Sequence, residues 1–216
     1  MVRKTKEEAL KTRQLLLDAA IEQFSRRGVS NTTLGDIADA AGLTRGAVYW
    51  HFASKSELFN AIWQEQLPLR DLLHQKLIQI ASGNPLLDLR NKFILALRYI
   101  AETPRQRALM QILYHKCEFS SDMMPEYEIR ARIGFSDELI REILQECVRN
   151  KILPADANIE IILLVLHSTF TGVIKNWLIA PQKFDLYQLA PQLVDYIMSS
   201  LCSPASRCVR PALVFN

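Results

Sequence analysis

Several residue types that carry familiar functions are scarce in this chain of 216 residues. It has four histidines, and its four cysteines, Cys117, Cys147, Cys202 and Cys208, are too far apart to form a C-x-x-C pair. This spacing is typical of core or tail thiols in a reducing cytosol, and it argues against a disulfide framework or zinc site. Glycine loops for phosphate, nucleophile elbows and zinc-protease helices are absent as well. We therefore expect no metal, no cofactor and no enzymatic activity.

Long hydrophobic runs are also missing. The longest purely aliphatic run is Ile161–Leu166, whereas a membrane-spanning helix needs about 20 apolar residues. The charged N-terminus lacks the apolar stretch of a secretory signal. These absences predict a cytoplasmic protein without a membrane partner.

Glycine accounts for only 7 of the 216 residues, and no Asn-Gly or Asp-Gly hairpin signal separates alternating apolar runs. The pattern predicts an all-α chain. Two prolines disturb it: Leu67-Pro68 predicts a bend in the fourth helix, and Pro191 predicts a kink or a helix start near Ala190. Helix caps and apolar periodicity predict about nine helices, at residues 7–26, 33–41, 45–51, 55–82, 85–101, 104–118, 123–150, 157–178 and 186–201.

Charge divides the chain into two parts. The formal net charge is +3, and residues 1–55 hold nine basic against six acidic residues, which leaves +3. The other 161 residues hold 17 of each sign and sum to zero. The first part, residues 1–53, and the second part, residues 54–202, therefore differ in kind. Residues 203–216, which contain Pro204 and Pro211, are expected to form a flexible tail.

The first part has the pattern of a small DNA-reading unit. A turn at Gly42 and a helix cap at Thr44 precede a short helix at residues 45–51. Val48 points inward, while two tiny residues and the aromatic pair Tyr49-Trp50 lie broadly on the other side. Small residues allow close approach to base edges, and aromatic rings suit sugars, phosphates and thymine methyls. The alternative is a generic three-helix cap that docks Tyr49-Trp50 on the rest of the protein.

Residues 31–52, NTTLGDIADAAGLTRGAVYWHF, and 55–59, KSELF, resemble the DNA-binding domain of TetR-family repressors. Patches at 3–9, 112–119 and 176–186 resemble the AcrR/AcrS branch, which represses multidrug-efflux operons. The resemblance implies an all-α homodimer with one helix-turn-helix per subunit on a palindromic double-stranded operator. By motif position it implies DNA contacts at Thr33, Thr44, Arg45, Gly46, Ala47, Tyr49, Trp50, His51 and Lys55.

The second part is rich in large apolar residues, which either form an ordinary core or line a pocket for small apolar or amphipathic ligands. The pocket candidates are Trp63, Leu67, Phe93, Leu97, Met110, Gln111, Tyr114, Ile140, His167, Phe170 and Trp177. The run at 161–166 is apolar nearly all round, which predicts a dimer surface. The alternative is docking within one subunit. A second stripe consists of Leu193, Val194, Tyr196, Ile197 and Leu201.

Together these features predict a ligand-responsive repressor of a multidrug-efflux operon. Its DNA-binding domain is expected at residues 1–53, and its helical ligand-binding and dimerisation domain at 54–202. A fourth helix near 40 Å long would connect the DNA-reading unit with the ligand core. Two alternatives remain. One is a DNA-binding activator, or a TetR-type regulator of a non-efflux operon, metabolic or envelope, with a different ligand. The other is a helical enzyme or small-molecule-binding protein with a vestigial DNA-binding head.

Overall fold

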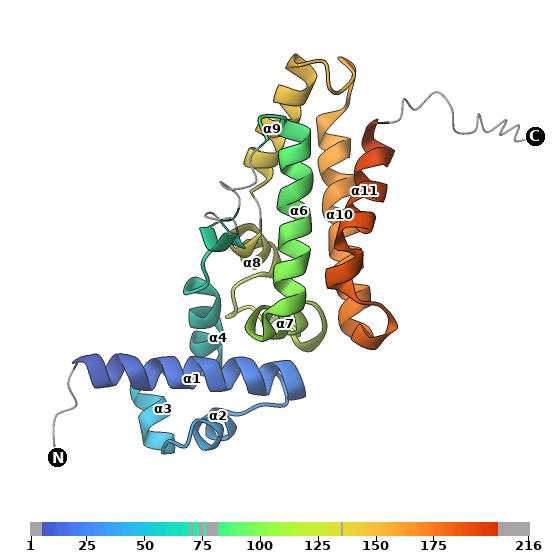
Figure 1. Ribbon diagram of the computed structural model, residues 1–216. Helices are drawn as coiled ribbons and strands as arrows, with labels where there is room; N and C mark the ends of the chain where they lie inside the picture. The colour runs from blue at the N-terminus through green and yellow to red at the C-terminus, as the bar shows by residue number, and fades with distance from the viewer. Residues whose placement is uncertain (1–5, 70, 74–75, 77–81, 135, 203–216) are drawn as a thin grey trace, which may run out of the picture.

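The computed structural model describes residues 6–69, 71–73, 76, 82–134 and 136–202. Over these residues the chain is helical without strands, so the all-α prediction is confirmed. A small unit built on α1 lies across the base of an upright bundle of longer helices (Figure 1). The expected tail at 203–216 lies outside the described residues.

The small unit consists of α1 (Lys6–Arg27), α2 (Leu34–Ala40) and α3 (Arg45–His51). The apolar stripe of α1 that contains Leu16, Ile21 and Phe24 is buried. From α3 and the residue after it, Val48 and Phe52 are buried in the same core. The three short helices therefore share one apolar centre, as their periodicity predicts.

Helix α4 (Lys55–Gln64) ends much earlier than the helix predicted at residues 55–82. Leu67 precedes Pro68, and the proline ring disfavours helical backbone at the residue before it. Helical conformation resumes at Leu69, where the Asp71 N–H donates to the Pro68 carbonyl over 2.9 Å. A ten-residue helix is about 15 Å long, so the prediction of one connecting helix near 40 Å is wrong.

The bundle contains α6 (Pro85–Glu102), α7 (Pro104–Gln111), α8 (Glu126–Ile133), α9 (Asp137–Arg149), α10 (Ile159–Ile179) and α11 (Leu186–Cys202). A π-helical turn, Ile112–Lys116, directly continues α7, and a 3-10 turn, Pro181–Lys183, precedes α11.

The helix predicted at residues 123–150 is two helices, α8 and α9, separated at Gly134. A Cβ added at Gly134 would lie 2.9 Å from the Arg130 carbonyl oxygen, so only glycine fits this close approach. Ser136 then starts α9, because its hydroxyl accepts from the Leu139 N–H over 3.2 Å. The described part of the chain therefore holds more helices than the nine expected.

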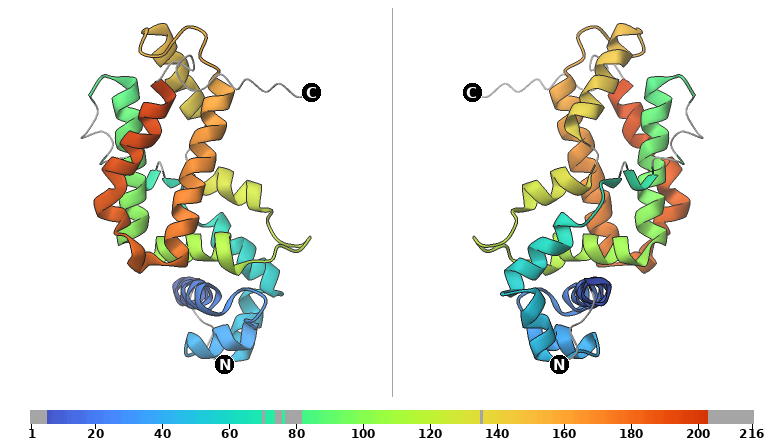
Figure 2. Two further views of the ribbon diagram at one scale, coloured as in Figure 1. Left: turned by 90° about the vertical axis from the view of Figure 1, so that its right-hand side faces the viewer. Right: turned by 90° about the vertical axis from the view of Figure 1, so that its left-hand side faces the viewer.

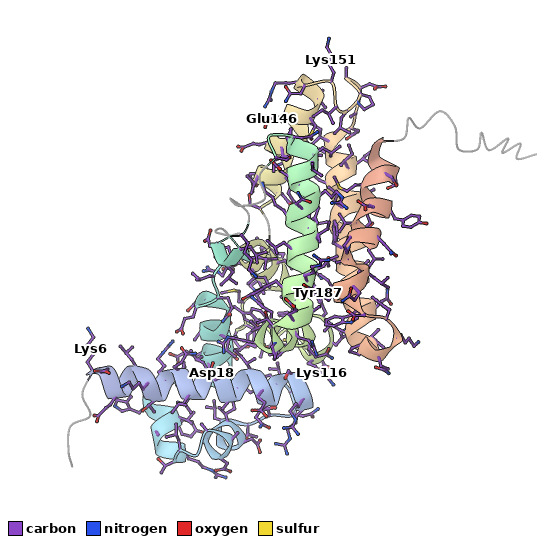
Figure 3. The ribbon with its side chains drawn as sticks, in the orientation of Figure 1. Lys6, Asp18, Lys116, Glu146, Lys151 and Tyr187 are labelled. Carbon is purple, nitrogen blue, oxygen red and sulfur yellow. The ribbon has the colours of Figure 1, made fainter. Side chains whose placement is uncertain are left out.

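Pro191 lies inside α11 and neither ends nor delays this helix. Proline has no N–H to donate to the carbonyl four residues earlier, which here belongs to Tyr187. The Arg98 Nε from α6 donates to that carbonyl over 3.3 Å, and the Arg98 guanidinium carbon lies 4.7 Å from the centre of the Tyr187 ring. Tyr187 marks this contact near the start of α11 (Figure 3). A neighbouring helix thus satisfies the group that the proline leaves unpaired.

The small unit and the bundle meet in an apolar junction. Rings of Phe24, Phe59, Trp63 and Phe119 pack with centroids 5.9–6.4 Å apart. In Figure 2, α1 is seen end-on beneath α7. In Figure 3, Lys116 lies beside the C-terminal half of α1. There the Val29 N–H donates to the Lys116 carbonyl over 2.8 Å.

Helix α10 is long and apolar enough to cross a membrane by length and composition alone, and 33% of its most apolar stretch is buried. The six-residue aliphatic run at 161–166 did not indicate a helix of this length and hydropathy. Ile162, Leu163 and Leu166 are buried in the bundle, whereas Ile161, Leu164 and Val165 are exposed. One face of α10 therefore belongs to the core, and the opposite face is an apolar surface.

Candidate DNA interface and ligand cavity

Helix α2 begins in a reciprocal cap. The Thr33 hydroxyl accepts from the Asp36 N–H over 3.1 Å, and the Asp36 carboxylate accepts from the Thr33 N–H over 2.8 Å. Hydrogen bonds from Thr33 hold the pKa of Asp36 below its usual value, with a smaller contribution from Arg27. The Thr33 hydroxyl also donates to Asp36 over 2.7 Å. Thr33, predicted to contact DNA, thus fixes the start of α2 in this structure.

The turn between α2 and α3 sets the direction of α3. Gly42 has a φ of +66°, a left-handed conformation that favours glycine. Thr44 then caps α3, since its hydroxyl accepts from the Ala47 N–H over 3.2 Å. Gly46 and Ala47 follow in the first turn of α3, where the lack of large side chains leaves the backbone accessible.

The outer face of α3 is strongly aromatic. Tyr49 is 61% exposed and Trp50 is 72% exposed, although both are large apolar side chains. The His51 ring packs edge-on against Trp50, with centroids 4.5 Å apart. Tyr49 and Trp50 do not dock on the bundle, so the structure gives no support to the generic-cap alternative.

Two basic predicted contacts lie at the ends of this surface. Arg45 crosses the start of α2, where a Cβ added at Gly35 would lie 3.1 Å from the Arg45 Nε. The Lys55 ammonium donates to the Val29 carbonyl over 2.7 Å and to that of Ser30 over 3.3 Å. Arg45 is exposed, whereas Lys55 joins the start of α4 to the loop after α1.

The bundle contains a partly open cavity of about 130 Å³. Its apolar wall includes the stacked rings of Phe93 and Phe170, whose centroids lie 4.2 Å apart. A cavity of similar size, about 150 Å³, binds benzene in another protein. The predicted pocket residues that line it are Phe93, Leu97, Met110, Tyr114, Ile140, His167 and Phe170.

The structure places the other four candidates elsewhere. Trp63 is fully buried in the junction, and Leu67 is 58% exposed beside the break at Pro68. Gln111 and Trp177 do not line the cavity either, and the Arg107 guanidinium lies over the Trp177 ring at 5.1 Å. Periodicity identifies large apolar positions on a helix but does not say which cavity or contact they reach.

Sequence reasoning identified Tyr114 and His167 among the polar lining residues and missed three others. These are Gln106, Arg130 and Thr171. Arg130 donates to the Thr171 hydroxyl over 3.1 Å and pairs with Glu126 one turn earlier on α8. In the sequence this pair resembles an ordinary surface i, i+4 ion pair. Burial raises the pKa of the neighbouring Tyr114 hydroxyl, which stays protonated at neutral pH.

No cluster of three or more His, Cys, Asp or Glu side chains that could hold a metal ion occurs among the described residues. Burial raises the pKa of the Cys117 thiol to about 11, so this thiol is not a thiolate nucleophile at neutral pH. A capped helix pair with an exposed aromatic reading face, set below a helical bundle, defines a helix-turn-helix DNA-binding regulator.

Comparisons with known proteins agree with that class. Residues 16–62 match the family described as "Bacterial regulatory proteins, tetR family", and residues 84–202 match "MAATS-type transcriptional repressor, C-terminal region". The chain belongs to the TetR family of bacterial transcriptional regulators, which are not enzymes.

Individual relatives are similar over nearly the whole chain. The probable acrEF/envCD operon repressor of Escherichia coli K12 is 46% identical over 198 residues, covering 92% of this chain and 90% of the relative. NalD, the secondary repressor of the MexAB-OprM multidrug efflux pump in Pseudomonas aeruginosa, is 31% identical with a TM-score of 0.70, over 90% and 97% of the two chains. A complex of SmeT with triclosan is 27% identical with a TM-score of 0.65, over 90% and 96%.

Proposed function

We propose that this protein is a cytoplasmic repressor that binds a palindromic operator as a homodimer, controls a multidrug-efflux operon and is released by small apolar or amphipathic ligands. Residues 1–53 read DNA, and residues 54–202 hold the ligand and the dimer surface, with α4 packed against both parts. The observation that carries the proposal is the exposed Tyr49-Trp50 face at one end and the largely apolar cavity at the other. Relatives named as efflux repressors support the choice of operon.

The exposed side of α10 is the proposed dimer surface. Ile161, Leu164 and Ile179 are 58%, 67% and 69% exposed along this helix. Asn176 donates its amide to the Gly172 carbonyl of the same helix over 2.9 Å, so its polar group needs no outside partner. Apolar side chains with internally satisfied polar neighbours fit a helix–helix contact, and a C2 contact would present two α3 helices about 34 Å apart.

The second predicted stripe, on α11, contributes less to this surface than expected. Val194 and Ile197 are buried within the subunit, because α11 packs along α6. Tyr196 is 81% exposed, and the Leu201 side chain lies outside the described residues. The proposed contact therefore centres on α10, with Tyr196 at its side.

Coupling between the cavity and the DNA-reading unit passes through residues 110–130. Met110, Tyr114 and Arg130 line the cavity on either side of the loop at 117–125. The Asn60 side chain of α4 makes two hydrogen bonds to the backbone of this loop. Its amide donates to the Asp122 carbonyl over 3.1 Å, and its oxygen accepts from the Met124 N–H over 2.6 Å. A ligand in the cavity would displace this segment and so disfavour operator binding. A coupling free energy of only about 1–3 kcal/mol between the two sites would weaken operator binding roughly 5- to 150-fold.

Selection of DNA from a random duplex library tests the proposal. We expect enrichment of a palindrome whose half-sites are about one helical turn apart. Adding a releasing drug should weaken binding to the selected sequence. Failure to enrich any sequence, or enrichment of a single unpaired half-site, would contradict the proposed dimeric reader.

Matched variants locate the interface. Tyr49→Ala and Arg45→Ala should abolish the gel shift of the selected operator while the dimer stays folded. Their controls are Tyr127→Ala, which removes a 75% exposed tyrosine from α8, and Arg149→Ala on α9. Both controls should bind the operator normally. Normal binding by both α3 variants would overturn the assignment of α3 as the reader.

The operon assignment needs a separate measurement. The selected palindrome should occur upstream of an efflux operon in the source bacterium, and deleting the regulator should raise transcription of that operon. If the transcripts that rise encode metabolic or envelope functions instead, the regulator controls a non-efflux operon.

A further inference from the structure

The polar end of the cavity carries a specific charge pattern, which narrows the ligand class of the proposed function. Arg130 and Lys175 both lie over the Tyr114 ring, the guanidinium carbon at 4.7 Å and the ammonium nitrogen at 5.8 Å from its centroid. Arg130 also donates from Nη1 to the Thr171 hydroxyl over 3.1 Å. Arg130, Tyr114 and Thr171 line the cavity. Lys175 does not line the cavity. We call Tyr114, Arg130 and Thr171 the basic end.

One carboxylate offsets part of this charge without facing the ligand. Glu126 accepts from the Arg130 Nε over 2.8 Å and from Nη2, but it does not line the cavity. Arg130 is a cation in the cavity wall, whereas neither its partner Glu126 nor the exposed Lys175 lines the cavity. A guanidinium has five N–H groups, so Arg130 keeps donors beyond those that Glu126 and Thr171 accept.

The described part of the wall offers no carboxylate. Among the described lining residues, none is Asp or Glu. His167 lines the cavity, and its Nδ1 lies 3.1 Å from the carboxylate of Asp137, which does not line it. In residues 69–82, the sole acidic residue of the sequence is Asp71, and it is exposed. An organic cation in this cavity would lose its hydration without gaining a counter-charge.

We propose that the cavity selects aromatic ligands that carry an acidic oxygen, a carboxylate or phenolate, with that oxygen at Arg130 and Thr171 and the ring against Phe93 and Phe170. The inference rests on the proposed function, because it assumes that the cavity is the ligand site. A guanidinium–oxyanion hydrogen bond is about twice as strong as a neutral one. The stacked rings supply an apolar surface for the remainder of the ligand.

Three probes of the same shape and different charge test this selectivity on the full-length protein. They are para-isopropylbenzoate, para-isopropylbenzamide and para-isopropylbenzylammonium, and calorimetry measures their dissociation constants. We expect the carboxylate to bind about ten- to a hundredfold more tightly than the ammonium, with the amide between them. Equal or tighter binding of the ammonium, or no binding of any probe, would overturn the inference.

Arg130→Met should raise the dissociation constant of the carboxylate about tenfold or more while changing that of the amide less. Arg130→Lys, which keeps the charge, should retain the preference even if the methionine variant folds poorly. The matched control is Arg132→Met, which removes an arginine of the same helix that is likewise paired four residues back, with Glu128, but lies outside the cavity. A preference for the carboxylate that survives Arg130→Met unchanged would refute the role of Arg130.

Measuring operator binding with and without ligand distinguishes a failure of the charge preference from a failure of the proposed function. If drugs release the operator but the charge preference is missing, the inference fails while the proposed function stands. If the carboxylate is preferred but no ligand changes operator binding, the inference stands and the proposed mechanism of release fails.

Discussion

A single charge placed on the exposed side of α10 should split the dimer. Leu164 is 67% exposed in the single subunit and lies between Ile161 and Ser168, which are also exposed. Burying a whole leucine side chain stabilises a protein by about 1.5–3 kcal/mol, so burying the exposed part of Leu164 contributes about 1–2 kcal/mol. A C2 contact buries two copies, which gives about 2–4 kcal/mol.

Leu164→Glu removes this contribution and adds an unpaired carboxylate to the contact. The value of about 2–4 kcal/mol is therefore a lower bound on the free energy of dimerisation that the variant loses. The dimer dissociation constant should rise at least about 30- to 700-fold. Sedimentation velocity over a concentration series measures it. Since a palindromic operator needs two readers, the same variant should lose operator affinity at concentrations where it is monomeric.

Leu67→Glu is the matched control, because Leu67 is 58% exposed and lies outside α10 and α11. It introduces the same charge in place of the same residue and should leave the dimer unchanged. A dimer dissociation constant for Leu164→Glu within about threefold of the parent would refute the reasoning, because α10 would then be no part of the subunit contact.

Three further expectations concern stability and coupling. Arg98→Ala should destabilise the fold by about 1–3 kcal/mol, because the Tyr187 carbonyl loses its donor. Adding Pro191→Ala should restore much of that loss in chemical denaturation, and additive effects would contradict the account. Hydrogen bonds from Thr33 lower the folded pKa of Asp36, so the stabilisation is present above the ordinary value of 3.8 and is lost as pH falls through the lowered pKa. Asp36→Asn should therefore flatten the acid side of the stability profile, measured by circular dichroism. Asn60→Ala should reduce the drug-induced change in operator affinity, since it frees the 117–125 loop, whereas Asn150→Ala at the end of α9 should not.

The DNA-reading unit was predictable from sequence because its signals are local. Thr44 and Gly42 fix the turn before α3 through their own backbone neighbours. Val48 is inward and Tyr49 outward, as the periodicity of one short helix predicts. Lys55 departs from this pattern, because its ammonium binds carbonyls of Val29 and Ser30, more than 20 residues earlier. Such a contact depends on tertiary packing, which no local spacing indicates.

The cavity was less predictable for the same physical reason. Apolar positions such as Phe93 and Phe170 come from helices far apart in the sequence, and only the packed bundle decides that their rings stack. Trp63 is also a large apolar residue, but it is buried in the junction between the small unit and the bundle instead of lining the cavity. Arg130 has the spacing of a surface ion pair with Glu126, and nothing in that spacing reveals that Arg130 also lines the cavity.

The breaks in the predicted long helices have a common location. Helical conformation resumes at Leu69, the π-helical turn contains Tyr114, and Gly134 follows the last residue of α8; all three residues line the cavity. An uninterrupted helix through any of these points would carry its side chains past the bundle on a regular 3.6-residue period. Turns of π-helix within helices frequently occur at functional sites. The helical pattern predicted from the sequence therefore departs from the structure at three residues that line the cavity, where tertiary packing overrides local propensity.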